Sequence, residues 1–203
     1  MLLIWGWRTR FKTLGEGIFH CPSCGGDRHY AHKQARNWFT LFFIPLIPLK
    51  VRGSFVECRT CGQGYDERIL AMPTSASLGE QLTAATREAV VHLLRVGDSP
   101  TARAAAVQAI SQVSAAPWSE AALQADLHGL DTGQLPARLR QLGEVMNEHG
   151  KERFLASVAT VAAGGGVVGG AGRQVLSAIA ADLGMTPAHA RGVIDQVLDP
   201  SDR

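Results

Sequence analysis

The four cysteines of this 203-residue chain form two Cys-X-X-Cys pairs, and a glycine follows each pair. Two cysteines separated by two residues in a tight turn can direct both sulfur atoms at one ion. The glycine permits a backbone turn that a β-carbon would obstruct. Two such pairs supply four thiolates, which complete a tetrahedron around zinc at about 2.3 Å. The spacing therefore predicts one structural Zn2+ ion, with no open position for water or substrate, bound by Cys21, Cys24, Cys58 and Cys61.

Two other interpretations of the cysteines stay open at this point. Redox-active Cys-X-X-Cys motifs usually belong to a βαβ unit, a setting that the glycine-rich sequence around these pairs does not indicate. Iron is the other alternative, because four thiolates also suit iron–sulfur chemistry. Three histidines lie near the pairs, but we expect them to be surface residues, since the cysteines already fill the tetrahedron; they are His20, His29 and His32.

The sequence around the cysteines also indicates a cellular compartment. Residues 1–7 are apolar, but the run is short, the basic residues follow it, and no small-residue cleavage site is present. Paired cysteines without an export signal are typical of a reducing compartment and of metal binding. We therefore expect a cytoplasmic protein, with peripheral attachment at the inner face of the membrane as the alternative.

Composition divides the chain into two parts. Of the 13 aromatic residues, 11 precede residue 71. Residues 1–70 carry ten Lys/Arg and five Asp/Glu, a charge of 10 − 5 = +5, whereas residues 71–203 carry ten and thirteen, a charge of 10 − 13 = −3. Four thiolates and one zinc ion would reduce the first charge to +3, which is less basic than a dedicated nucleic-acid-binding arm.

Residues 38–49 form the most apolar stretch of the chain. At twelve residues with two prolines, the stretch is too short and too broken for a transmembrane helix. It predicts a buried or edge pair of strands, packed in the small ribbon core or against the helical part. Exposure would instead indicate a membrane or partner surface, with Arg36, Lys50 and Arg52 beside anionic head groups. The candidate surface residues are Trp38, Phe39, Phe42, Phe43, Ile44, Leu46 and Ile47.

The remainder of the chain has the periodicity of helices. Residues 71–79 predict a linker, and from residue 80 apolar residues recur every three or four positions. Ser119 predicts an N-cap, and Thr186-Pro187 predicts a cap followed by a first-turn proline. The expected fold is α+β, with a small β zinc ribbon over residues 1–70 and an all-helical domain of about seven helices over residues 80–203. The seven helices are expected near residues 80–96, 101–115, 120–129, 136–150, 152–163, 173–183 and 187–198.

No set of catalytic residues emerges from the sequence. The serines lack a nucleophile-elbow motif, and the acidic residues occur singly at expected helix starts and faces. The glycine tract at residues 164–172 lacks the Gly-Lys-Ser/Thr of a phosphate-binding loop and follows an alanine-rich helical segment. We therefore expect a flexible loop there, with phosphate binding beside Arg173 as the alternative, and a protein that is not an enzyme.

Residues 5–70 resemble a bacterial zinc-ribbon family. The resemblance lies in the first cysteine pair, in the segment Trp-Phe-X-Leu-Phe-Phe-Ile-Pro-X-Ile-Pro at residues 38–48, and in the second cysteine pair. It implies a small β-ribbon with four cysteine ligands and no catalytic activity. Residues 78–198 more weakly resemble the TerB-like domain of tellurite-resistance proteins, which implies an all-helical fold. That family carries acidic residues where this chain has the glycine tract, so no cation site is carried over.

These observations favour a non-catalytic adaptor or scaffold that presents surfaces to a protein partner in a stress-response or envelope-associated system. A peripheral membrane module that uses residues 38–49 is one alternative. Nucleic-acid binding by the basic first part is the other. The sequence does not indicate an oligomeric state.

Overall fold

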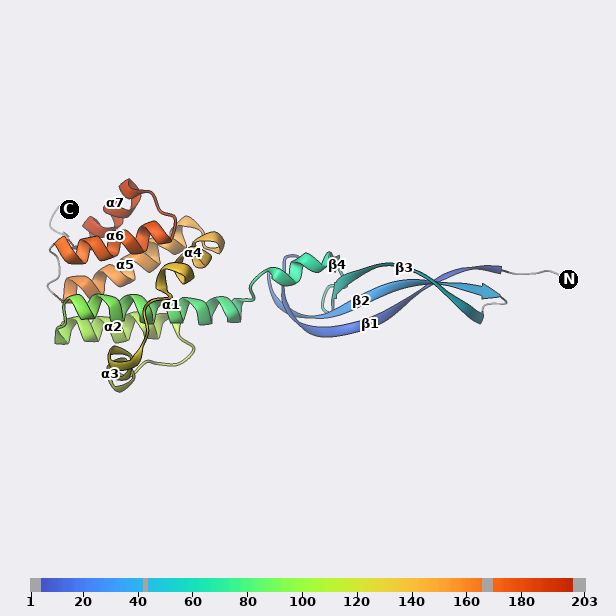
Figure 1. Cartoon of the computed structure of the whole chain (residues 1–203), viewed down its shortest axis with the longest axis horizontal. Helices are drawn as coiled ribbons and strands as arrows, with labels where there is room; N and C mark the ends of the chain where they lie inside the picture. The colour runs from blue at the N-terminus through green and yellow to red at the C-terminus, as the bar shows by residue number, and fades with distance from the viewer. Residues whose placement is uncertain (1–4, 42–43, 166–169, 199–203) are drawn as a thin grey trace. The chain divides into compact units, whose positions relative to one another are not determined.

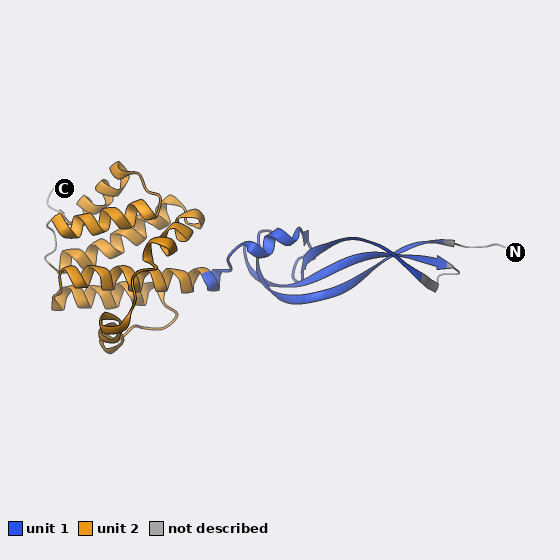
Figure 2. Cartoon of the chain, viewed as in Figure 1, with its two compact units in different colours: residues 1–77 blue, residues 78–203 orange. Residues whose placement is uncertain are grey.

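The computed structural model describes residues 5–41, 44–165 and 170–198 (Figure 1). The chain divides into two compact units, Met1–Ser77 and Leu78–Arg203 (Figure 2). The division lies within residues 71–79, where the sequence predicts a linker. The first unit contains a β-sheet, and the second contains helices, so the predicted α+β class is confirmed at this level.

The first unit is a four-stranded antiparallel sheet whose strands follow one another in sequence order. Its elements are β1 (Trp5–Cys21), β2 (Gly26–Leu41), β3 (Ile44–Cys58), β4 (Gly64–Tyr65) and the 3-10 helix η1 (Glu67–Ala71). Three of the strands have 15 to 17 residues, which is well beyond the usual five or six. The first cysteine pair lies where β1 turns into β2, and the second begins at Cys58, the last residue of β3.

The apolar stretch at residues 38–49 forms the end of β2 and the start of β3. Pro45 lies opposite Thr40 and Pro48 lies opposite Trp38, and the strand register shifts beside both prolines. Proline has no N–H to donate to the ladder, so it fits on an outer strand or at a bulge. β3 meets this requirement, because its pairing with β4 is limited to Val56 and Glu57.

The buried core of the sheet lies beside the cysteines. Phe19 is 1% exposed, and its ring meets the rings of Tyr30 and Tyr65 edge-on at centroid distances of 5.7 Å. Farther from the cysteines the sheet forms a ribbon arm, which we define as residues 5–13, 33–41 and 44–53. Trp7 and Ile47 on this arm are more than half exposed. Among the described residues, the buried hydrophobic cluster of the sheet therefore lies at its cysteine end.

The described residues of the second unit, together with Ser75–Ser77, form seven helices. They are α1 (Ser75–Val96), α2 (Pro100–Val113), α3 (Glu120–Gly129), α4 (Leu135–Val145), α5 (Glu148–Gly164), α6 (Gly170–Asp182) and α7 (Pro187–Leu198). Ser119 caps α3 as predicted, because its Oγ accepts a hydrogen bond from the Ala122 N–H at 3.1 Å. None of the described helices is long and apolar enough to cross a membrane.

Two helix boundaries differ from the prediction because of capping side chains. α1 begins at Ser75 rather than near residue 80, since Thr74 Oγ1 accepts a hydrogen bond from the Ser77 N–H at 3.1 Å. α4 ends at Val145 and α5 begins at Glu148, whereas the sequence predicts one helix as far as Gly150. Asn147 separates the two helices as the N-cap of α5, because its Oδ1 accepts a hydrogen bond from the Gly150 N–H at 2.8 Å.

Candidate metal centre

Both cysteine pairs lie in turns that require glycine. The N–H groups of Cys24 and Gly25 donate to the Cys21 carbonyl at 3.2 and 3.0 Å, and Gly25 has a φ of +64°. In the second turn the Gly62 N–H donates to the Cys58 carbonyl at 2.9 Å, and Gly62 has a φ of +73°. A side chain would strain the backbone at either glycine. The sequence motif therefore fixes the two turns that orient the sulfur atoms.

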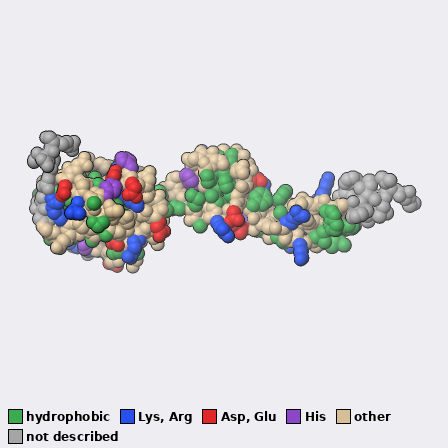
Figure 3. All heavy atoms as spheres, turned by 90° about the horizontal axis from the view of Figure 1, so that it is seen from above, with side chains coloured by type: hydrophobic (Ala, Val, Ile, Leu, Met, Phe, Trp, Pro, Cys, Tyr) green, Lys and Arg blue, Asp and Glu red, His purple; other side chains and the backbone are tan. Residues whose placement is uncertain are grey.

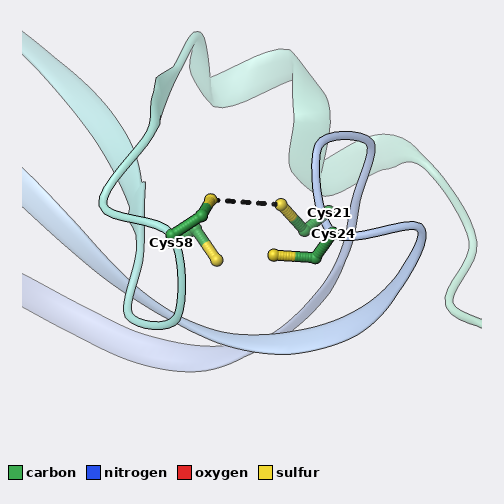
Figure 4. A group of neighbouring side chains, drawn as sticks. Cys21, Cys24 and Cys58 are labelled. Atoms are coloured by element: carbon green, nitrogen blue, oxygen red, sulfur yellow. Dashed lines mark hydrogen bonds between the residues drawn. The ribbon is translucent and has the colours of Figure 1, made fainter.

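The four cysteine sulfur atoms converge, although the two pairs lie far apart in the sequence. All four Sγ atoms lie within 4.8 Å of one another. Cys21 Sγ is 3.8 Å from Cys61 Sγ, and the side chains of Cys21, Cys24 and Cys58 point toward a common centre (Figure 4). Four sulfur atoms about 2.3 Å from zinc lie about 3.8 Å apart at the corners of a tetrahedron. The residues therefore fit a single zinc ion.

The environment of the cysteines is that of a closed structural site. All four are free of disulfides. Cys21 and Cys58 are buried in the small core, Cys24 is half-buried, and Cys61 is exposed. Four protein thiolates would fill the tetrahedral positions of zinc, so the ion would stabilise the fold and bind no substrate.

Ionisation of the thiols differs strongly within the cluster. Burial disfavours a thiolate at Cys21, but hydrogen bonds from the Tyr65 hydroxyl and from neighbouring groups outweigh it and lower the pKa of Cys21 to about 6. Burial and the thiols around Cys24 act in the same direction there and raise the pKa of Cys24 to about 12. Without a cation the cluster therefore keeps at least one thiol protonated at neutral pH.

Zinc affinity should increase with pH. Every zinc ion that binds must displace at least the proton of Cys24, whose pKa lies above the whole neutral range. One displaced proton changes the apparent affinity by about tenfold per pH unit. Competition with a chromophoric chelator at several pH values between about 6 and 9 measures this slope, once the chelator's own titration has been subtracted. An affinity that does not change with pH would exclude thiolate ligation.

Tyr65 contributes to the site, although the sequence did not single it out. Its hydroxyl lies 3.3 Å from Cys21 Sγ and 2.7 Å from Ser23 Oγ. Because Ser23 has a proton of its own to donate to the Tyr65 oxygen, the single Tyr65 proton is available to a Cys21 thiolate. β4 places this hydroxyl beside the first turn, because Tyr65 pairs with Val56 on β3. A hydroxyl near a metal-bound thiolate can donate a hydrogen bond that orients the sulfur and tunes its charge. The only signal in the sequence is its position, four residues after Cys61.

Removal of the Tyr65 hydroxyl should weaken zinc binding without unfolding the sheet. We expect Tyr65→Phe to reduce zinc affinity by about tenfold, the lower end of the effect of groups that orient metal ligands. The matched control is Tyr30→Phe, since the Tyr30 ring also packs edge-on against Phe19 but its hydroxyl forms no hydrogen bond among the described residues. Equal affinities of the two variants would show that the Tyr65 hydroxyl has no role in the site.

Two of the three nearby histidines lie beside carboxylates. His20 lies 3.4 Å from Asp27 and His32 lies 2.5 Å from Glu67. Asp27 also accepts hydrogen bonds from the Ser75 N–H at 2.9 and 3.0 Å, which lower the pKa of its carboxyl and connect the first turn to the start of α1. His20, His29 and His32 are outside the metal-binding group found in the described residues.

The other predicted surface residues are only partly described. Trp38 and Phe39 are half-buried, and Ile47 is 56% exposed. Phe42 and Phe43 lie outside the described residues, as do the side chains of Ile44 and Leu46, so the prediction for these four is not tested. The glycine tract is also only partly described, because residues 166–169 lie outside the described ranges.

The second unit contains cavities, but its described residues do not assemble a metal-binding group. A cavity of about 480 Å³ lies among α1, α4 and α6. Its lining is mainly apolar, and its polar members include His92, Gln174 and Asp182. Asp182 lies 3.8 Å from Arg140, so its carboxylate has a charged partner outside the cavity lining. Two other acidic residues of this unit are buried ion-pair partners rather than solvated charges: Asp126 is 7% exposed and pairs with Arg87, and Glu88 is 4% exposed and pairs with Arg138.

Comparison with known proteins supports the assignment of the first unit. Comparisons with curated proteins and with solved structures found no match. The comparison with protein families matched residues 19–87 to a zinc-ribbon family. The match contains both cysteine pairs and Tyr65, and it ends within α1. Residues 19–87 are therefore similar to zinc ribbons, and their four converging cysteines form a site for one structural zinc ion.

Proposed function

We propose that this chain is a non-catalytic adaptor in which zinc stabilises a β-ribbon that presents a protein-binding surface. The observation that carries the proposal is the exposure of large apolar side chains on the ribbon arm. Trp7 is 63% exposed, Phe11 60% and Ile47 56%. Exposed apolar side chains gathered in one region are typical of interaction sites. A closed four-thiolate site supports a structural rather than a catalytic role for the metal.

We also propose that the helical domain is a divergent TerB-like bundle and that the protein works in the cytoplasm, within a stress-response or envelope-associated system. The first proposal rests on the sequence resemblance of residues 78–198, and four free cysteines support a reducing compartment. The glycine tract lacks the carboxylates that hard cations require. We therefore expect Ca2+ and Mg2+ to leave the thermal unfolding midpoint of the bundle unchanged.

Photocrosslinking in cells tests the adaptor proposal. A photoreactive amino acid replaces Phe11 on the arm, and a control carries it at the exposed Val145 at the end of α4. We expect a discrete protein adduct from position 11 that the Cys58→Ser variant does not form, because that variant lacks the folded ribbon. Absence of a zinc-dependent protein adduct would contradict the proposal, and adducts to lipid or nucleic acid would support the corresponding alternative instead.

A further inference from the structure

The two outer strands of the ribbon arm differ in their capacity to pair with another strand. Among the described residues β1 pairs only with β2, and the pairing is regular from Trp5 to Thr13. No proline interrupts β1. β3 is the opposite edge, but Pro45, Pro48 and three shifts of register disrupt its pairing with β2. Unpaired N–H and C=O groups on a regular edge are a template for an added strand, so β1 is the suitable edge.

Side chains along β1 alternate between two chemical types. Trp7, Thr9 and Phe11 share one face, where the Trp7 ring meets Phe39 edge-on at 5.9 Å. Arg8, Arg10 and Lys12 occupy the alternate positions and therefore point to the other face. A strand added to β1 would present its own alternate side chains to these two faces. One set of its side chains would lie beside aromatic groups and the other beside cations.

Most cations on the ribbon arm have no anionic partner within the described structure; Lys33, which pairs with Glu57, is the exception. Six Lys and Arg side chains on the arm form neither a hydrogen bond nor an ion pair; they are Arg8, Arg10, Lys12, Arg36, Lys50 and Arg52. The acidic residues of the first unit lie outside the arm and have partners of their own, as in Glu16–Arg59, Asp27–His20, Glu57–Lys33, Asp66–Arg68 and Glu67–His32. Figure 3 shows blue basic side chains standing beside green apolar ones along the described part of the arm.

Two of these cations lie directly opposite each other on neighbouring strands. Arg10 on β1 lies opposite Arg36 on β2. Like charges at directly opposed positions destabilise a sheet, and both side chains are exposed. An anionic group beside β1 would relieve this repulsion, so the charge distribution itself favours a negatively charged ligand at this edge.

We propose that residues 5–13 of β1 bind an extended acidic peptide as an additional strand of the sheet, with acidic and apolar residues alternating along the peptide. This inference rests on the proposed adaptor function and names the class of its partner. The peptide's backbone completes the β1 ladder. Its acidic side chains lie beside Arg8, Arg10 and Lys12, and its apolar side chains lie beside Trp7 and Phe11.

Other occupants of this edge fit less well. A second copy of β1 would place arginine and lysine side chains beside one another, which like-charge repulsion opposes. An anionic membrane or a single-stranded nucleic acid would contact side chains on one face of the sheet and would leave the edge N–H and C=O groups of β1 unpaired. On β1 the aromatic groups and the cations point to opposite faces. A peptide strand contacts both faces at once, because its side chains alternate in the same way.

Fluorescence anisotropy with synthetic peptides tests the proposal on the zinc-loaded full chain. The probe is a labelled peptide of alternating glutamate and valine that is long enough to cover residues 5–13. One control peptide groups the glutamates at one end, and another replaces them with lysine. We expect the alternating acidic peptide to bind about tenfold more tightly than either control. Hydrogen exchange of the complex should show slower exchange in residues 5–13, where the ladder forms.

Matched charge reversals locate the site. We expect Arg8→Glu/Arg10→Glu to lower the affinity for the alternating acidic peptide by about tenfold and to raise the affinity for the lysine peptide. Lys50→Glu/Arg52→Glu makes the same change in net charge on β3 and should shift affinity by less than about threefold. Zinc content verifies the fold of each variant, and Arg8→Gln/Arg10→Gln replaces the first variant if it loses zinc.

Three results would overturn the proposal. They are no binding of the alternating acidic peptide, an equal loss of affinity in the two double charge reversals, or hydrogen exchange in residues 5–13 that the peptide does not slow. Tighter binding of anionic vesicles or of a single-stranded oligonucleotide, with the same dependence on Arg8 and Arg10, would also overturn it. The adaptor proposal has a separate readout. If the photocrosslinked protein adduct persists in Arg8→Glu/Arg10→Glu, the adaptor function stands and the acidic-strand inference fails.

Discussion

Replacement of Cys58 by serine should abolish zinc binding and unfold the ribbon while the helical bundle stays folded. A structural zinc site contributes about 10–16 kcal/mol to the folding of a small module. The ribbon has little else to stabilise it, since its buried core is Phe19, Val56 and two of the cysteines themselves. The bundle has two larger cores of its own. Far-UV circular dichroism should therefore retain the helical signal while NMR resonances of residues 5–71 collapse to unfolded positions.

The control for this prediction lies in the same turn. Thr60→Ser also changes one side chain of the second Cys-X-X-Cys segment, but Thr60 is exposed and contributes no ligand. This variant should keep one zinc ion and a folded ribbon. A folded, metal-free Cys58→Ser ribbon would contradict the account, because the small core would then suffice without the ion.

Gly143→Ala should destabilise the helical bundle by about 3 kcal/mol, near the upper end of the usual cost of overpacking. A β-carbon at Gly143 on α4 would lie 2.5 Å from the carbonyl oxygen of Leu183, just after α6. The contact is with backbone, so no side-chain rotation relieves it, and α4 must move away from Leu183. Chemical denaturation followed by circular dichroism measures the change in the free energy of unfolding.

Gly192→Ala on α7 is the matched control, because a β-carbon there would meet nothing within 4 Å. Alanine is the better helix former by about 1 kcal/mol, so this variant should gain stability. The same substitution is thus expected to have opposite signs at two helical glycines. Equal effects at both positions would contradict the close approach of α4 to Leu183.

The sequence predicted the structure best at residue types that have few structural roles, such as paired cysteines, turn glycines and helix caps. Cys-X-X-Cys-Gly predicted both turns and the convergence of four sulfur atoms, because the glycines need a positive φ and the cysteines are too few for a second site. Ser119 and Pro187 marked helix starts correctly. Asn147 was missed, because Met146 and His149 around it continue an acceptable helical pattern, and only the capping hydrogen bond reveals the break.

The length of the strands was harder to predict. A half-buried strand alternates apolar and polar residues because one face is covered. On the ribbon arm aromatic and basic residues of β1 alternate although neither face is covered, so the alternation there marks no buried face and does not indicate how far the strand extends. The role of Tyr65 could not be predicted either, since it depends on β4 lying beside the turn that contains Cys21. Both depend on contacts between distant segments rather than on local sequence.

The assignment of a structural zinc ion is tested most directly by metal analysis of the purified full chain together with X-ray absorption at the zinc edge. The account predicts one zinc ion per chain with four sulfur ligands at about 2.3 Å. A chain that retains its folded ribbon with no stoichiometric metal, or with nitrogen or oxygen atoms in place of sulfur, would contradict it.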